Sequence, residues 1–148
     1  MTIGEFCNRE VVIATQDSTI VEVAKRMRQY HVGDVVVVDS SGSENKPVGI
    51  ITDRDIVLKI VAGEVDHHAV IAGDVMSREI LIGREQDGIW ATLQRMRSHG
   101  VRRLPVVNDR GGLEGIVTVD DLLELLSEEL LSLSRLVNRE IEREKERT

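Results

Sequence analysis

At 148 residues and 41% hydrophobic content, the chain has the composition of a globular protein, although half of it alone would bury only a marginal core. A net charge of −7 and a content of one Trp, one Tyr and one Phe argue against a nucleic-acid partner. The longest apolar runs are far shorter than the ~20 residues that span a bilayer, and the start MTIGEFCNRE has no signal-peptide core. We therefore expect a cytoplasmic protein with no membrane association, which also fits the lone Cys7.

The chain reads as two copies of one pattern. CNREVV at 7–12 aligns with MSREIL at 76–81, and AKRMRQYHVGDVVVV at 24–38 aligns with LQRMRSHGVRRLPVV at 93–107, both at an offset of 69 residues. GIITDRD at 49–55 returns as GIVTVDD at 115–121, at an offset of 66. The change of offset falls in the turn-rich stretch between Asp39 and Pro47, where a length change is tolerated. This pattern indicates a duplicated supersecondary unit.

Each copy predicts the same order of elements. Short aliphatic runs at 11–14 and 80–82 predict strands, and apolar residues at helical spacing predict helices over 18–30 and 86–99. The uninterrupted apolar runs at 35–38 and 104–107 are typical of strands buried on both faces. A third strand follows at 48–51 or 114–117, and Thr then opens another helix. We expect a mixed α/β (α+β) fold of two β-α-β-β-α repeats at 5–63 and 74–130, a linker at 64–73 and a C-terminal helical extension at 131–148.

The Thr-x-x-Asp at each last strand-to-helix junction has two compatible interpretations. A Thr at the start of a helix with an acid three residues later predicts a capping box. The same place suits a nucleotide, because a carboxylate can accept bonds from ribose hydroxyls and a helix N-terminus favours phosphate. Gly49 and Gly115, which precede the two junctions, would let a ligand approach the backbone closely.

The element order, the HGVRRLPVV strand and the two G-h-h-T-x-x-D motifs resemble paired cystathionine β-synthase (CBS) domains, also called a Bateman module, over about residues 5–130. The resemblance implies two repeats packed about a pseudo-twofold axis, with clefts for adenosine-containing ligands. AMP or ATP is the first expectation, with NAD and S-adenosylmethionine as further possibilities, and no catalytic cofactor is implied. It also implies a homodimer, which is common for such pairs.

The resemblance implies specific binding residues. Thr52 with Asp55, and Thr118 with Asp121, match the ribose-contacting pairs. Cationic phosphate contacts are expected from Arg102 and Arg103, and also from Arg54, with solvated surface charge as the alternative for each. Val35 and Leu104 are candidate walls for the adenine ring, although core packing would explain them equally well. The complete set of expected ligand-binding residues is Val35, Thr52, Arg54, Asp55, Arg102, Arg103, Leu104, Thr118 and Asp121.

The two copies differ at one place that bears on ligand charge. Gly33 and Asp34 stand in the first copy where Arg102 and Arg103 stand in the second. A carboxylate at this position opposes a phosphate, so the two clefts are not expected to bind one ligand equally. Sequence leaves open which cleft is the weaker.

Other chemistry is poorly represented. His67 and His68 are adjacent in the linker, and adjacent side chains rarely point at one metal ion, so we expect no metal site. The common nucleophile, phosphate-loop and metalloprotease motifs are absent, and we expect no enzymatic activity.

The C-terminal segment has an apolar face that needs a partner surface. Leucines and other aliphatics recur at three- and four-residue spacing from Leu122 to Ile141. The stretch after about Glu128 either packs on a second subunit or folds back on its own chain. The leading hypothesis is a stand-alone signal-transduction protein that senses adenine nucleotides and regulates a separate, unidentified protein. The alternative is a dimeric interaction scaffold in which both Thr-Asp pairs are only helix caps.

Overall fold

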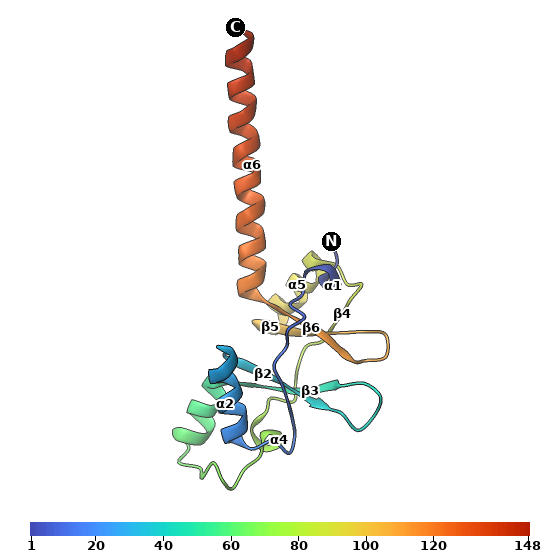
Figure 1. The fold of residues 1–148 in the computed structure, drawn as a ribbon, viewed down its shortest axis with the longest axis vertical. Helices are drawn as coiled ribbons and strands as arrows, with labels where there is room; N and C mark the ends of the chain where they lie inside the picture. The colour runs from blue at the N-terminus through green and yellow to red at the C-terminus, as the bar shows by residue number, and fades with distance from the viewer. The chain divides into compact units, whose positions relative to one another are not determined.

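The computed structural model describes residues 1–148, which form two compact units, Met1–Val117 and Thr118–Thr148 (Figure 1). The order of elements confirms the predicted mixed α/β fold with two repeats. The first repeat contains β1 (Ile13–Thr15), α2 (Ile20–Tyr30), β2 (Asp34–Asp39), β3 (Lys46–Thr52), α3 (Asp53–Asp55) and a π-helix, η1 (Ile56–Val61). The second contains β4 (Gly83–Arg84), α5 (Ile89–His99), β5 (Arg103–Val107), β6 (Leu113–Thr118) and α6 (Val119–Arg147), and two short helices, α1 (Ile3–Phe6) and α4 (Ala72–Val75), precede the repeats.

Each repeat forms a three-stranded sheet, with strand orders β1-β2-β3 and β4-β5-β6. In the first sheet β1 runs parallel to β2, and β2 runs antiparallel to β3 with Asp34 opposite Thr52. The entrance of β1, the start of β2 and the end of β3 therefore lie at the same end of the sheet. This end carries Asp34 and the first Thr-x-x-Asp junction.

Strand β2 is buried on both faces, as its unbroken run of valines predicts. Val35 and Val37 belong to a core cluster that includes Val23 and Met27 of α2. The intervening Val36 and Val38 belong to a second cluster, which includes Ile116 of β6. A helix thus covers one face of the first sheet, and residues of the second repeat cover the other.

The entry segment of each repeat crosses to the other repeat, which sequence periodicity did not predict. The Gly4 amide in α1 donates to the Glu85 carbonyl at 2.9 Å, and the equivalent Gly73 amide in α4 donates to the Gln16 carbonyl at 2.9 Å. Figure 1 shows α1 beside α5 and β4. Short antiparallel bridges continue the exchange, from residue 8 to 116 and from residue 50 to 77. Each half therefore completes the fold of the other.

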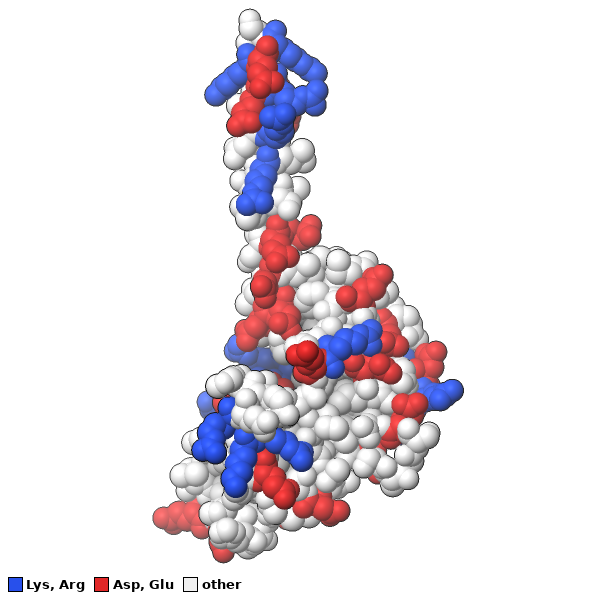
Figure 2. Space-filling model, in the orientation of Figure 1, with Lys and Arg blue, Asp and Glu red and all other residues white.

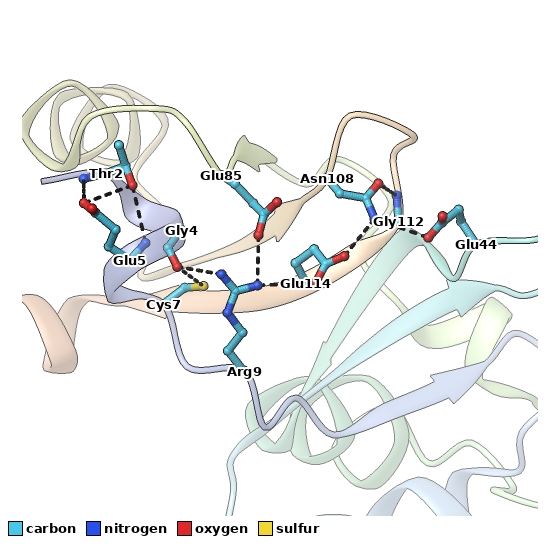
Figure 3. A network of polar contacts seen from close by, with 10 residues as sticks. All are labelled: Thr2, Gly4, Glu5, Cys7, Arg9, Glu44, Glu85, Asn108, Gly112 and Glu114. Atoms are coloured by element: carbon cyan, nitrogen blue, oxygen red, sulfur yellow. Dashed lines mark hydrogen bonds and ion pairs between the residues drawn. The ribbon is translucent and has the colours of Figure 1, made fainter.

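Polar side chains hold the first crossing segment in place (Figure 3). The Arg9 guanidinium lies 2.9 Å from a carboxylate oxygen of Glu85 and 3.3 Å from one of Glu114, and it donates to the Gly4 carbonyl at 2.7 Å. Asn108 donates to Glu114 at 2.8 Å and so extends this network. Since Arg9 is about half exposed, its main effect is to fix the path of the chain rather than to add much stability.

Gly49 and Gly115 lie against other protein atoms and do not border an open space for a ligand. A Cβ atom at Gly49 would lie 2.5 Å from Sδ of Met76 and 2.9 Å from the Ser77 carbonyl oxygen. A Cβ atom at Gly115 would lie 2.5 Å from Sγ of Cys7 and 2.9 Å from the carbonyl oxygen of residue 8. Both glycines thus make room for the crossing segment of the other repeat.

Some element positions differ from the sequence-based expectation. The first strand of the second repeat is Gly83–Arg84 rather than 80–82, and Ile80 instead packs, partly buried, against the cluster formed by Val36, Val38, Ile50 and Ile116. The helix that follows Thr52 begins as α3 and continues as the π-helix η1, which ends at Val61. The helix that follows Thr118 is continuous to Arg147. None of the helices combines the length and apolarity that crossing a bilayer requires.

Candidate functional site

The first Thr-Asp pair forms a reciprocal cap at the end of β3, and the predicted capping role is confirmed. The Asp55 amide donates to Thr52 Oγ1 at 3.0 Å, and the Thr52 amide donates to Asp55 Oδ2 at 2.9 Å. Both residues are partly exposed. The exchange satisfies two amides that no helical carbonyl can reach, and it fixes both side chains at the end of the sheet that carries Asp34.

The second carboxylate oxygen of Asp55 faces a cation. Asp55 Oδ1 lies 3.5 Å from Nζ of Lys59, which also donates to the Val75 carbonyl at 3.0 Å. This separation is long for a hydrogen bond, so Oδ1 retains the capacity to accept a bond from a ligand hydroxyl. The Asp55 side chain is 22% exposed, which leaves it accessible from solvent.

Asp34 and Arg103, at equivalent positions of the two repeats, meet each other. Arg103 Nε lies 3.0 Å from Asp34 Oδ2, and both side chains are partly buried, with 27% and 21% of their surface exposed. The separation is that of an ion pair, but Nε lacks the alignment of a hydrogen bond. Burial is the main cause that raises the pKa of Asp34, and the nearby Asp53 raises it further, while Arg103 lowers it. The sequence comparison identified the acid-for-base difference but not this contact.

A cavity of about 870 Å³ opens beside β1. Its lining mixes aliphatic residues of the segment that forms β1 with polar ones, α2 contributes Tyr30 and Arg26, and the Arg26 guanidinium donates to the Ile13 carbonyl. The volume is typical of a small-molecule site. Thr52 and Asp55 do not line the cavity. The segment that enters β1 does line it, and this segment reaches the end of the sheet at which Thr52 and Asp55 lie. The lining residues missed by sequence reasoning include Val11, Val12, Tyr30 and Val32.

The positions of Val35, Leu104, Arg54 and Arg102 are less favourable for contact with a bound ligand. Val35 and Leu104 are fully buried, as core packing requires, and neither presents a wall to an open space. Arg54 and Arg102 are exposed. Of the three arginines expected to contact phosphate, Arg103 is the least exposed, and its guanidinium pairs with Asp34.

The second Thr-Asp pair lies at the start of α6, and its predicted cap is confirmed for the Thr118 side chain, while the reciprocal bond to the Asp121 carboxylate is not formed. The Asp121 amide donates to Thr118 Oγ1 at 3.2 Å. Asp120 and Asp121 place two acids in the first turn, where they complement the helix dipole. This arrangement is compatible with the ribose-contacting role that the resemblance implies for Thr118 and Asp121.

Two further groups of reactive side chains have structural explanations. Asp66 joins His67 and His68 in an exposed cluster whose ligand atoms lie within 4.8 Å of one another. Asp66 Oδ1, however, accepts from the His68 amide at 3.0 Å, which is the geometry of an Asx turn. Cys7 is buried against the second repeat, and this burial raises the pKa of its thiol and favours the unreactive protonated form.

Comparisons with known proteins agree with the fold. The sequence model of the CBS domain matches residues 3–62 and 72–128. An uncharacterised protein of Methanopyrus kandleri is 38% identical over 125 residues, which cover 84% of this chain and 62% of that protein. The chain thus spans less than two thirds of the length of this relative.

Two solved structures share the architecture. A CBS domain protein of Pyrobaculum aerophilum, complexed with AMP, is 28% identical with a TM-score of 0.73 and covers 86% of this chain and 99% of its own. The CBS domain pair of protein MJ0100, in complex with 5′-methylthioadenosine and S-adenosyl-L-methionine, is 25% identical with a TM-score of 0.73, covering 85% and 99%. With two matched domains and the same fold, this chain belongs to the CBS domain family and contains a pair of CBS domains.

Proposed function

We propose that this protein is a non-catalytic regulatory module that binds an adenosine-containing ligand and signals its presence to a separate protein. One observation carries the proposal. The Thr52–Asp55 pair lies at one end of the first sheet, and the segment that lines the cavity enters the sheet at that same end. Aliphatic residues suit the adenine ring, and the Asp55 carboxylate suits the ribose hydroxyls. Two related CBS proteins are in complex with AMP or with adenosyl sulfur compounds, which supports the ligand class.

Signalling requires that the ligand bind two conformations of the protein with different affinities. The fold offers a way to couple binding to shape, because segments of each repeat cross to the other. A ligand held at Thr52 and Asp55 would stabilise the end of the first sheet, where β3, α3 and the start of β2 meet. The identity of the regulated protein would follow from capture experiments with and without the ligand.

Thermal unfolding in the presence of AMP, ATP, NAD, S-adenosylmethionine and 5′-methylthioadenosine tests this proposal. A ligand at a hundred times its dissociation constant stabilises the folded state by about 2.7 kcal/mol, which raises the melting temperature of a chain this size by roughly 5 to 10 °C. We expect such a shift with at least one of these ligands and none with guanosine or uridine. Equal shifts with all nucleosides would contradict adenosine recognition.

We also propose that α6 pairs in antiparallel orientation with α6 of a second copy of this chain. The helix carries exposed apolar residues, among which Leu130, Leu133 and Val137 follow the spacing of one helical face. Its charges are unevenly distributed (Figure 2). Five acids and no bases occur from residue 119 to 134, whereas residues 135 to 147 hold all five bases of the helix together with four acids, which leaves that half with a net charge of +1. An antiparallel pair places each acidic half opposite a half that contains the bases, while a parallel pair would place acids beside acids.

Substituting Leu133 with Glu should convert the dimer into a monomer, because it places a charge at the centre of the apolar face. Ser132→Glu adds the same charge on the side of the helix away from Leu130 and Val137 and should leave the dimer intact. The molar mass measured by light scattering distinguishes the outcomes. A wild-type monomer at ~100 μM, or a dimer that persists in the Leu133 variant, would contradict this arrangement.

A further inference from the structure

The end of the first sheet holds an unusual number of acids around the predicted ribose site. Asp34 lies opposite Thr52 in the strand register, and the Asp53 amide donates to the Gly33 carbonyl at 2.9 Å. The Asp53 carboxylate lies so close to Gly33 that a Cβ atom there would be 3.1 Å from Oδ2. With Asp55, three carboxylates therefore surround the junction at which β3 ends.

Two of the cations at this junction are each paired with one of these acids. Arg103 Nε lies 3.0 Å from Asp34, and Lys59 Nζ lies 3.5 Å from Asp55. A phosphate that took the place of Asp34 on Arg103 Nε would displace the Asp34 carboxylate, whereas a phosphate bound by the terminal guanidinium nitrogens would lie beside it. A displaced Asp34 carboxylate would be partly buried, without its cation and near Asp53, and a retained one would repel the phosphate, so both arrangements are unfavourable.

A ligand without negative charge meets no such penalty. A neutral thioether or a positively charged sulfonium on the 5′ carbon leaves the Asp34–Arg103 pair closed, and a sulfonium is also attracted by the surrounding carboxylates. Arg103 Nε lies within ion-pair distance of Asp34 but is not aligned for a hydrogen bond with it. In the absence of the Asp34 carboxylate, Arg103 Nε could form a well-aligned hydrogen bond with a phosphate oxygen.

We propose that Asp34 selects the charge of the ligand: by pairing with Arg103, it makes the Thr52–Asp55 half-site favour adenosine compounds with a neutral or cationic 5′ substituent over adenosine phosphates. This inference rests on the proposed adenosine-binding function and names the ligand class of that site. It departs from the sequence-based expectation that AMP or ATP is the first choice, and it assigns Asp34 a role beyond ion pairing.

The test compares dissociation constants for AMP and 5′-methylthioadenosine in the wild type and in Asp34→Asn. The wild type should prefer methylthioadenosine by about tenfold or more, and the Asn variant should shift the ratio toward AMP by about tenfold or more. Adding Arg103→Gln to the Asn variant should reverse this shift, since the gain depends on the released guanidinium. Asp39→Asn, at the other end of β2, should leave the ratio unchanged. Equal affinities in the wild type, or a ratio unaffected by the Asn substitution, would overturn the inference.

A test with an anion that contains no adenosine distinguishes a failure of this inference from a failure of the proposed function. Pyrophosphate should raise the melting temperature of Asp34→Asn by several degrees more than that of the wild type, whether or not adenosine binds. If the Asn variant is unstable, Asp34→Ser serves the same purpose. Failure of every adenosine compound to bind would refute the proposed function, and an equal response of variant and wild type to pyrophosphate would refute the role of Asp34.

Discussion

Replacing Asp55 with Ala should abolish the stabilisation of this protein by adenosine ligands. The substitution removes the carboxylate that we propose to contact the ribose, and also the acceptor for the Thr52 amide. Loss of the cap alone should lower the free energy of unfolding by about 1 kcal/mol. Loss of the ribose contacts should remove most of the ligand-induced rise in melting temperature, because a ribose hydroxyl bonded to a carboxylate contributes roughly 1.5 to 3 kcal/mol.

Asp74→Ala separates these two effects. Asp74 Oδ2 accepts from the Ile71 amide at 2.9 Å, the same capping geometry as that of Asp55 at Thr52, but it lies at the start of α4 and is not an expected ligand residue. Both variants should lose similar intrinsic stability, and only the Asp55 variant should lose the response to ligand. A ligand-induced shift that survives in Asp55→Ala would show that the pair is only a cap.

Replacing Gly115 with Ala should destabilise the fold by about 1 to 3 kcal/mol, because the new methyl group would meet the Asn8 backbone carbonyl and the Cys7 side chain. Gly49→Ala should have a comparable effect through Met76 and Ser77. Gly42, which has open space around the position of a Cβ atom, provides the control. Urea unfolding measures the three variants, and an unchanged midpoint for Gly115→Ala would contradict the tight crossing of the first segment.

The duplication and the order of elements were predictable from sequence because they depend on local patterns. The valine run of β2 identified a strand buried on both faces, and the Thr-x-x-Asp spacing identified two helix caps. These features depend on residues within one turn or one strand of each other, which is the range over which periodicity and capping act.

The crossing of α1 and α4 was not predictable from the same patterns. Each helix has four residues, which is too short for a helical period, and its partners lie far away in sequence. The prediction of a strand at 80–82 was wrong for a related reason, because an apolar run indicates burial, and Ile80 is partly buried by packing against a cluster rather than by strand pairing. Both errors come from tertiary contacts that override local preference.

The contact between Asp34 and Arg103 had a sequence signal that could have been used. Equivalent positions near a twofold axis face each other, and these two positions align in the repeats with opposite charge. The cavity beside β1 had no such signal, since its lining mixes aliphatic and polar residues in no pattern that marks a site. The sequence therefore led to the proposal of the Thr52–Asp55 pair, and the residues that line the cavity were missed.

Calorimetric titration of the wild-type protein with unmodified adenosine tests the central claim most directly. Adenosine contains the base and ribose that the cavity and the Thr52–Asp55 pair are proposed to hold, and it has no charge to engage Asp34 or Arg103. We predict saturable binding that is lost in Asp55→Ala and retained in Asp74→Ala. Absence of binding by adenosine, and equally by its 5′-thioether and phosphate derivatives, would contradict the account and favour a dimeric scaffold with the Thr-Asp pairs as helix caps alone.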